Sequence, residues 1–296
     1  MISTSFDLLS VDELTEELRS IGYVANRGLA TSLLISMKLG RPILLEGEVG
    51  VGKTELAKSI SKLLGRKLIR LQCYEGIDTN QALYEWDYAR QMLQIRAMSG
   101  NEVSDKSVDD LFGSKFLIER PLLQAIKAGD QCVLLIDEVD RADDEFEAFL
   151  LELLSDFQIT IPEIGTIAAT SRPIVILTSN RTRELHDALK RRCLYNWIGF
   201  PAQEQEIEIV KSRVPGVSDQ LASKVVGTVN KLREMDLEKS PGVAETIDWV
   251  QSLEAIGASS LNETNAAETL GAVIKGRDDL EYVSGNLAEI VSDASN

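Results

Sequence analysis

The sequence predicts an α/β protein in which a parallel β-sheet is flanked by helices and followed by a smaller all-helical region. Residues 43–45, 132–136 and 173–178 are almost entirely apolar, as in parallel strands that are buried on both faces. Segments with the apolar spacing of helices separate these runs, and no strand-like run follows residue 204. The chain has 296 residues, which is enough for one large and one small domain.

The first part of the chain predicts helices at 11–20 and 26–38, a strand at 43–45, a helix from about residue 55, and a strand at 67–73. The segment between this strand and the one at 132–136 is too long for a simple crossover, so an insertion is expected near 80–110. Its aromatic residues Tyr84 and Trp86 favour local packing over contact with a substrate chain.

A second insertion is expected at 157–170, where the residues alternate like a short hairpin that bends at 162–165. Residues 1–200 then form the α/β domain with its two insertions. Residues 201–296, whose apolar spacing is helical throughout, form the small helical domain.

The string GEVGVGKT follows the first strand and precedes a helix-prone segment, which is the context of a phosphate-binding loop. Glycines let backbone N–H groups turn towards phosphate oxygens, the lysine reaches the β and γ phosphates, and the threonine hydroxyl can hold Mg²⁺. A glycine-rich turn without a ligand is the less favoured interpretation. The predicted nucleoside triphosphate contacts are Gly47, Glu48, Val49, Gly50, Val51, Gly52, Lys53 and Thr54.

Two further strands end in polar residues that suit phosphate chemistry. The strand at 132–136 leads into Asp137 and Glu138; the aspartate can hold Mg²⁺ together with Thr54, and the glutamate can orient water for attack on the γ-phosphate. Alone, an acidic turn after a strand is common, but the glycine loop favours the catalytic interpretation. Asn180, after the strand at 173–178, either contacts this water or the γ-phosphate, or simply ends the strand.

These three strands and their motifs, in this order, resemble the AAA+ ATPases and, more specifically, the MoxR family. The matching strings are GEVGVGKT, VLLIDEVDRADDEFEAFLLELLSD, FQITIPEIGTI and TSN. The strings LIRLQCYEGIDTNQALYEWDYARQ and SNRTRELHDALKRRCLYNWIGFP resemble the CoxD-like branch associated with carbon monoxide dehydrogenase maturation. The resemblance spans roughly residues 20–285 and implies an AAA+ core, with ATP and Mg²⁺ as cofactors, followed by a small all-α lid domain.

The resemblance also implies roles for individual residues. Asp137 and Glu138 correspond to the Walker B pair, and Asn180 to the sensor of the γ-phosphate. Arg192 corresponds to the arginine that reaches the neighbouring subunit's site, with Arg191 as the reserve candidate. A basic helix end stabilised by the helix dipole explains some of this charge, but not the preference for arginine.

The resemblance to the MoxR family fails at one expected site residue in the lid. MoxR-type lids carry an arginine in a Ser-Pro-Arg motif, whereas residues 239–242 read Lys-Ser-Pro-Gly, so no second sensor is assigned. The AAA+ plan also implies that Tyr23 lies near the adenine, and that both insertions project towards the pore of a ring.

Composition restricts the partners. The formal net charge of −16 and the lack of a basic face argue against nucleic-acid binding. No run approaches the roughly 18 apolar residues of a membrane helix, and the first residues are too polar for a signal peptide. The three cysteines lie far apart, which indicates a reducing, cytoplasmic location without a zinc site.

Four function classes follow. The leading one is a ring-forming ATPase, expected to be a hexamer, that remodels a partner protein. The resemblance implies a client metalloenzyme and a helper protein with a von Willebrand factor A domain. The alternatives are a P-loop kinase, an AAA+ protein acting on nucleic acid, and a nucleotide-held scaffold. Glu138 after Asp137 argues against the kinase and the scaffold, and the negative charge argues against the nucleic-acid class.

Overall fold

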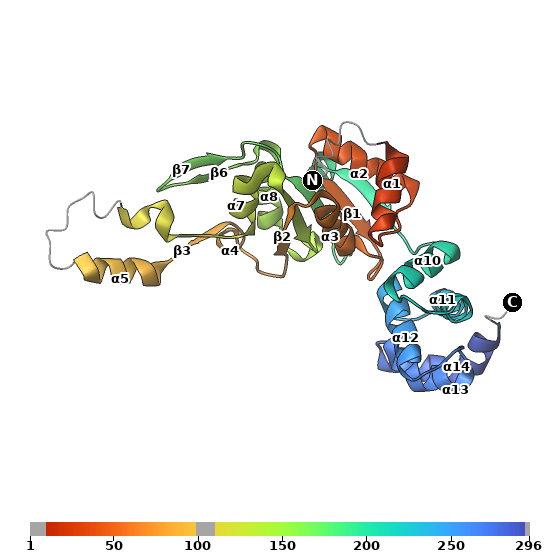
Figure 1. Cartoon of the computed structure of the whole chain (residues 1–296). Helices are drawn as coiled ribbons and strands as arrows, with labels where there is room; N and C mark the ends of the chain where they lie inside the picture. The colour runs from red at the N-terminus through yellow and green to blue at the C-terminus, as the bar shows by residue number, and fades with distance from the viewer. Residues whose placement is uncertain (1–9, 99–109, 294–296) are drawn as a thin grey trace. The chain divides into compact units, whose positions relative to one another are not determined.

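The computed structural model describes residues 10–98 and 110–293, and a five-stranded sheet lies at the centre of the fold (Figure 1). From one edge to the other its strands are β2 (Lys67–Gln72), β5 (Cys132–Asp137), β8 (Ile174–Ser179), β1 (Ile43–Gly47) and β9 (Leu194–Ile198). β5 pairs in parallel with β2 and with β8, and β8 pairs in parallel with β1. The predicted α/β fold with a parallel sheet is confirmed.

The burial of each strand explains whether the sequence predicts it. Every residue of β1, β5 and β8 is buried, which accounts for their apolar runs. These strands and β2 are confirmed, whereas β9 was not predicted. β9 is an edge strand in which half-buried and exposed residues alternate, so its sequence LYNWI has no continuous apolar run.

Helices flank the sheet and bury their apolar faces against it (Figure 1). The helices predicted at 11–20 and 26–38 are confirmed, and α7 packs on β2 and β5. Among the described residues, the α-helices that flank the sheet are α1 (Val11–Ser20), α2 (Arg27–Leu39), α3 (Lys53–Leu64), α7 (Pro121–Ala128), α8 (Asp144–Asp156) and α9 (Asp187–Arg192).

The chain divides into two compact units. The first contains the described residues of 1–14, 27–46 and 57–196, and the second contains 15–26, 47–56 and the described residues from 197 onwards. The glycine loop therefore belongs to the same unit as the C-terminal helices, and the ends of β5 and β8 belong to the other unit.

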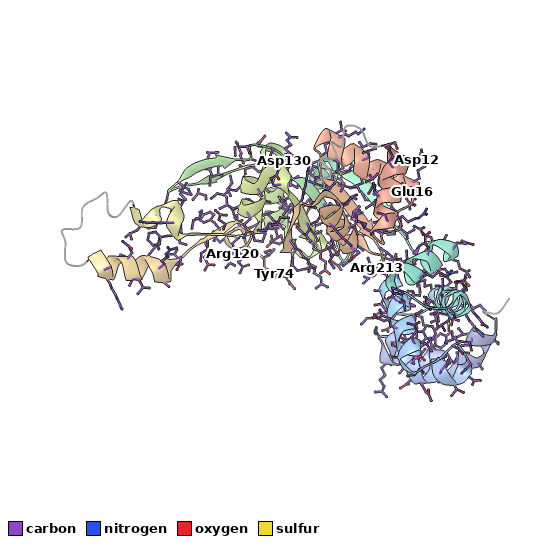
Figure 2. The ribbon with its side chains drawn as sticks, in the orientation of Figure 1. Asp12, Glu16, Tyr74, Arg120, Asp130 and Arg213 are labelled. Carbon is purple, nitrogen blue, oxygen red and sulfur yellow. The ribbon has the colours of Figure 1, made fainter. Side chains whose placement is uncertain are left out.

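Residues 79–119 of the first unit contain α4 (Thr79–Leu83), β3 (Tyr84–Trp86), α5 (Tyr88–Met98), two 3₁₀ turns (Asp110–Phe112 and Ser114–Phe116) and β4 (Leu117–Glu119). Residues 99–109 of the expected first insertion lie outside the described residues. β3 and β4 pair antiparallel, and Arg120 at the start of α7 lies 2.5 Å from the Glu85 carboxylate (Figure 2). Trp86 is buried edge-on against Tyr84 and Phe112, so its role is the local packing that the sequence favours.

Residues 158–168 form a separate antiparallel hairpin from β6 (Gln158–Ile161) and β7 (Gly165–Ala168). The inward side chains of β6 are buried, while those of β7 are mostly exposed. This one-sided burial produces the alternation seen in the sequence.

Beyond residue 200, the described residues of the second unit form the α-helices α10 (Gln203–Arg213), α11 (Asp219–Glu234), α12 (Val243–Ala255), α13 (Glu263–Thr269) and α14 (Arg277–Asp293). Their apolar faces enclose Trp249, whose Nε1 donates to the Thr269 hydroxyl at 2.8 Å. A buried ion pair joins Arg233 of α11 to Glu206 of α10 at 2.6 Å. In the part of the chain that the structure describes, no helix is both long and apolar enough to cross a membrane.

Candidate functional site

The glycine loop follows β1 and ends where α3 begins. Gly50 and Gly52 have φ angles of +77° and +93°, which side chains with a Cβ rarely adopt. The Lys53 side chain is 6% exposed, and its ammonium group donates to the carbonyls of Gly47 at 2.8 Å and Glu48 at 2.6 Å. The lysine thus lies against the backbone at the start of the loop.

The remaining loop residues differ in exposure. Glu48 and Val49 are exposed, whereas Val51 and Thr54 are half-buried. Gly47 is enclosed, because a Cβ there would lie 1.9 Å from the carbonyl oxygen of Ile198 in β9. Glycine at the start of the loop is therefore required by the neighbouring strand as well as by the loop.

The tip of the loop touches the start of α12. The Ala244 N–H donates to the Gly50 carbonyl at 3.3 Å. A Cβ on Gly242 would lie 2.6 Å from the Val49 carbonyl oxygen and 2.9 Å from the Gly50 Cα. Gly242 is the glycine of the Lys-Ser-Pro-Gly string, and this close approach gives a physical reason for glycine at that position.

Tyr23 also lies beside the glycine loop. A Cβ on Gly52 would be 3.9 Å from the Tyr23 ring, and the tyrosine is 8% exposed. Burial, reinforced by the charge of Glu55, raises the Tyr23 pKa. Glu55 in turn forms an ion pair with Arg213 of α10, which is labelled in Figure 2; Arg213 Nη2 lies 2.7 Å from Glu55 Oε1. The glycine loop, Tyr23 and α10 therefore lie close together. That Tyr23 contacts the adenine stays a prediction.

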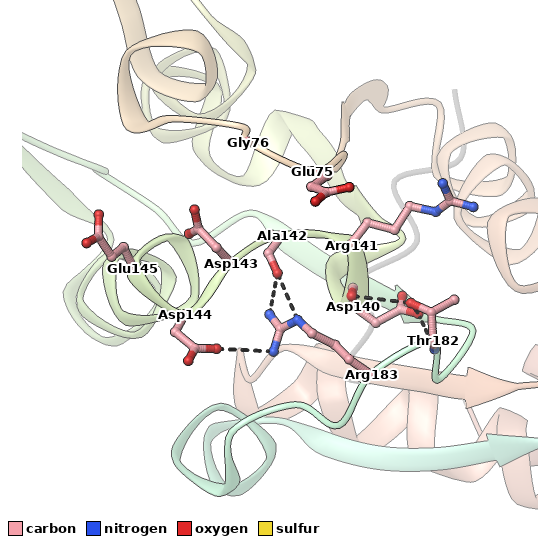
Figure 3. A pocket seen from close by; sticks show the side chains of 10 residues that line it. All are labelled: Glu75, Gly76, Asp140, Arg141, Ala142, Asp143, Asp144, Glu145, Thr182 and Arg183. Atoms are coloured by element: carbon pink, nitrogen blue, oxygen red, sulfur yellow. Dashed lines mark hydrogen bonds and ion pairs between the residues drawn. The ribbon is translucent and has the colours of Figure 1, made fainter.

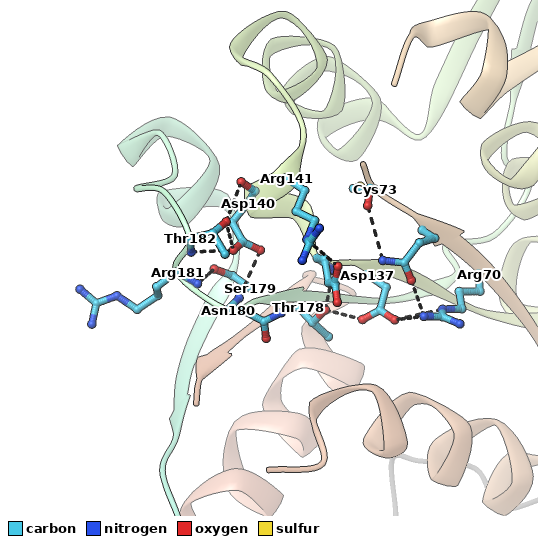
Figure 4. Close-up of polar contacts among 12 residues, drawn as sticks. Arg70, Cys73, Asp137, Asp140, Arg141, Thr178, Ser179, Asn180, Arg181 and Thr182 are labelled. Atoms are coloured by element: carbon cyan, nitrogen blue, oxygen red, sulfur yellow. Dashed lines mark hydrogen bonds and ion pairs between the residues drawn. The ribbon is translucent and has the colours of Figure 1, made fainter. Parts of the chain in front are cut away.

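At the end of β5, the Asp137 carboxylate is 2% exposed (Figure 4). Its Oδ1 accepts from the Thr178 hydroxyl of β8 at 2.5 Å. Its Oδ2 accepts from Arg70 of β2 through Nε at 3.0 Å and Nη2 at 2.6 Å. Arginine and hydroxyl partners offset the cost of burying this charge and hold the carboxylate in one orientation.

Glu138 leaves β5 in a left-handed conformation, with φ +54° and ψ +50°. Its N–H donates to the Thr178 hydroxyl at 2.9 Å, so Thr178 contacts both residues of the predicted Walker B pair. The side chain of Glu138 is about one-third exposed and pairs with Arg141 at 2.8 Å. Exposed pairs of this kind contribute only about 0–1 kcal/mol, so the glutamate can leave its partner easily.

Asn180 follows β8, the neighbour of β5 in the sheet, and is half-buried. Because parallel strands end at the same edge, Asn180 lies at the edge where Asp137 and Glu138 end. Its N–H donates to the Asp140 carboxylate at 3.2 Å. The structure therefore brings three of the predicted residues together at one edge.

Cys73 follows β2 next to this edge. Burial, followed by the charges of Asp137, Asp140 and Glu138, raises the pKa of its thiol to about 12. The thiol stays protonated near neutral pH and is not a nucleophile there.

Arg191 and Arg192 lie at the C-terminal end of α9, and both are exposed. The sequence did not reveal a partner for Arg192 within its own chain, but the structure contains one. The Arg192 Nε donates to the Ser155 hydroxyl of α8 at 2.6 Å, since α8 and α9 pack side by side.

A pocket of about 800 Å³ lies beside this edge, between the segments that follow β2, β5 and β8 (Figure 3). Residues 75–76, 140–145 and 182–183 line it. Five carboxylates and two arginines contribute to this lining, so its charge repels phosphates. Glu138 and Asn180 are not among the lining residues.

The comparison with protein families decides the class. A model of the AAA domain, dynein-related subfamily, matches residues 42–193, which is more than half of the chain. The chain belongs to this family. Membership in this AAA+ ATPase family implies nucleotide binding and ATP hydrolysis.

Two curated proteins and one solved structure illustrate what this AAA domain protein is similar to. It is 23% identical over 206 residues to an uncharacterized protein of Staphylococcus saprophyticus, covering 67% of this chain and 71% of the relative. It is 25% identical over 232 residues to the gas vesicle ATPase GvpN of Haloferax mediterranei, covering 74% of this chain but only 64% of that protein. A solved structure of a Thermotoga maritima RuvB variant has 17% identity and a TM-score of 0.49, covering 96% of this chain and 80% of RuvB.

Replacing Gly242 with alanine is expected to weaken ATP binding by about tenfold or more, since overpacking against backbone atoms commonly costs about 1–3 kcal/mol. The added methyl group would push α12 away from the Val49 carbonyl and disturb the loop that receives the phosphates. Titration with a fluorescent ATP analogue measures the effect, and thermal unfolding shows whether the variant folds.

Gly271→Ala is the matched control, because a Cβ on Gly271 meets nothing within 4 Å. It should bind ATP like the natural protein. Equal affinities of the Gly242 and Gly271 variants would show that the close approach has no influence on nucleotide binding.

Proposed function

We propose that this AAA+ ATPase is of the MoxR type, requires Mg²⁺, and uses ATP hydrolysis to remodel a partner protein. The observation that carries the proposal is the edge formed by β5 and β8, where Asp137 and Glu138 share one hydroxyl partner, Thr178, and Asn180 ends the adjacent strand. The glycine loop follows the next strand of the same sheet.

The side chains suit the roles proposed for them. Asp137 and Thr54 offer the oxygen ligands that Mg²⁺ prefers. Bound Mg²⁺ would offset the negative charge of the phosphates. Lys53 would turn from the loop carbonyls to the phosphates.

Glu138 is the proposed group that orients water. It is accessible, and its pair with Arg141 is weak enough to break. Asn180 would donate or accept a hydrogen bond near the γ-phosphate from its place on the neighbouring strand. This pair favours transfer of the phosphoryl group to water, as in an ATPase, over transfer to a substrate hydroxyl.

Glu138→Gln should bind ATP normally but hydrolyse it at least about a hundredfold more slowly, because the amide cannot accept the proton of the water. Phosphate release without any added acceptor measures turnover. Lys53→Ala should instead lose most of its affinity for ATP. Glu145→Gln, on the exposed first turn of α8, is the control and should keep its activity; near-natural turnover of Glu138→Gln would contradict the assigned role.

We also propose that the chain assembles into rings, as hexamers, in which Arg192 acts on the nucleotide of the neighbouring copy. Its exposed guanidinium and its place at the end of α9 support this role. The contact with Ser155 would hold the side chain until a neighbour binds.

Arg192→Ala should bind ATP yet hydrolyse it about 10³-fold more slowly, because an arginine supplied to the transition state is typically worth at least that much. Mixing it with Lys53→Ala should restore part of the activity, since some interfaces then combine an intact loop with an intact arginine. Steady-state ATPase assays over a series of mixing ratios measure the rescue.

Two controls separate this role from a structural one. Ser155→Ala removes the contact within the chain and should remain active; equal losses in Ser155→Ala and Arg192→Ala would identify a structural arginine. Rescue that requires Arg191→Ala in the mixture, with Arg192→Ala near normal, would assign the role to Arg191 instead.

The proposed client is a metalloenzyme such as a molybdenum-containing carbon monoxide dehydrogenase, matured with a von Willebrand factor A domain protein. The support is the resemblance of residues 68–91 and 179–201 to the CoxD-like branch. Deleting the gene should leave the metalloenzyme polypeptide folded but inactive, with an incomplete metal centre. Metal analysis of the purified client tests this, and full metal loading in the deletion strain would contradict it.

A further inference from the structure

Asp140 is a buried carboxylate to which neither the sequence motifs nor the proposed reaction assigns a role. It lies in the 3₁₀ turn Val139–Arg141, two residues after Glu138, and is 2% exposed. A carboxylate in such surroundings is costly unless hydrogen bonds satisfy it. Its partners therefore indicate what it does.

Among the residues that the structure describes, the hydrogen bonds to the Asp140 carboxylate come from the segment after β8 (Figure 4). Oδ1 accepts from the Asn180 N–H at 3.2 Å. Oδ2 accepts from the Thr182 N–H at 2.8 Å and from its hydroxyl at 2.7 Å. The same hydroxyl also contacts the Asp140 carbonyl oxygen at 3.3 Å. One side chain thus binds both sides of Arg181.

The backbone that Asp140 holds is unusual. Arg181 has a φ of +57°, in the left-handed region that non-glycine residues seldom adopt, and Glu138 has a φ of +54° on the facing segment. Such conformations persist where surrounding contacts impose them. The Asp140 bonds to the two N–H groups flanking Arg181 are contacts of this kind.

We infer that Asp140 is a positioning residue that fixes Asn180 relative to Glu138 for hydrolysis. Asp140 is connected to Glu138 through a single residue, Val139, and to Asn180 through one direct hydrogen bond. The distance between the residue that orients water and the residue that contacts the γ-phosphate therefore depends on this carboxylate. The inference rests on the proposed function.

An aspartate suits this task better than an asparagine. The two oxygens accept three hydrogen bonds from Asn180 and Thr182. An amide has only one acceptor oxygen, and its NH₂ group would face a backbone N–H. Asp140→Asn therefore releases one side of the segment with little change in volume.

The test compares kcat and ATP affinity of Asp140→Asn. Its kcat should fall between about tenfold and a hundredfold, as misplacement of a reacting group by about 1 Å can cause, while the dissociation constant for a fluorescent ATP analogue stays within about twofold. A loss of folded protein would instead lower the number of binding sites. Asp143→Asn is the matched control: it changes a carboxylate of the same segment that accepts from the Phe146 N–H to cap α8, whereas the hydrogen bonds described above from Asn180 and Thr182 go to Asp140.

A double-mutant cycle distinguishes positioning of Asn180 from an independent role. If Asp140 acts through Asn180, adding Asp140→Asn to Asn180→Ala slows turnover by no more than about twofold. If the fold-losses in kcat of the two single variants multiply in the double variant, the inference is wrong. It is also wrong if Asp140→Asn folds and keeps the natural kcat.

If Asp140→Asn does not fold, Thr182→Val serves as the second variant. It removes only the hydroxyl bonds to Asp140 and keeps the Thr182 N–H. A several-fold lower kcat that disappears in the Asn180→Ala background supports the inference, and unchanged kcat opposes it. Failure of the proposed function is recognised separately, since Glu138→Gln and Asn180→Ala would then both keep natural turnover.

Discussion

The end of the central sheet depends on buried charges, each of which has a hydrogen-bonding or ion-pairing partner. Asp137, Asp140 and Glu147 are each at most 2% exposed, and all three lie within residues 137–147, which begin at the last residue of β5. An isolated buried carboxylate would cost several kcal/mol or lose its charge. Hydrogen bonds or ion pairs from the surrounding segments offset this cost, which ties the chain after β5 to its neighbours in the sheet.

Each carboxylate fastens a different part of the chain. Asp137 holds β2 and β8 through Arg70 and Thr178, and Asp140 holds the segment after β8. Glu147 accepts from the His186 N–H at 3.0 Å, just before α9, and pairs with Arg183. Asp140 and Glu147 therefore bind the chain between Asn180 and the start of α9, and Arg192 lies at the other end of that helix. In this way the segment that carries Glu138 also supports the helix that carries Arg192.

In the other unit, close contacts between backbone atoms hold the glycine loop in position. Gly47 meets β9, and Gly50 meets Gly242 at the start of α12, at distances that leave no room for a Cβ. Two glycines of the phosphate-binding motif therefore serve packing as well as the loop conformation. A loop held in this way is formed before nucleotide arrives, which lowers the entropy lost on binding.

The sequence by itself determined the fold class and four of the five central strands, and it named the candidate site residues at the strand ends. It could do so because strands buried on both faces must be apolar throughout, and because glycines and carboxylates at strand ends form compact local motifs. Only the tertiary structure revealed β9, the partner of Arg192 and the role of Asp140. An edge strand has no continuous apolar run, and Ser155 and Asp140 acquire their contacts from segments about 40 residues away. Such contacts depend on which strands are neighbours in the sheet, and local sequence patterns do not predict that order.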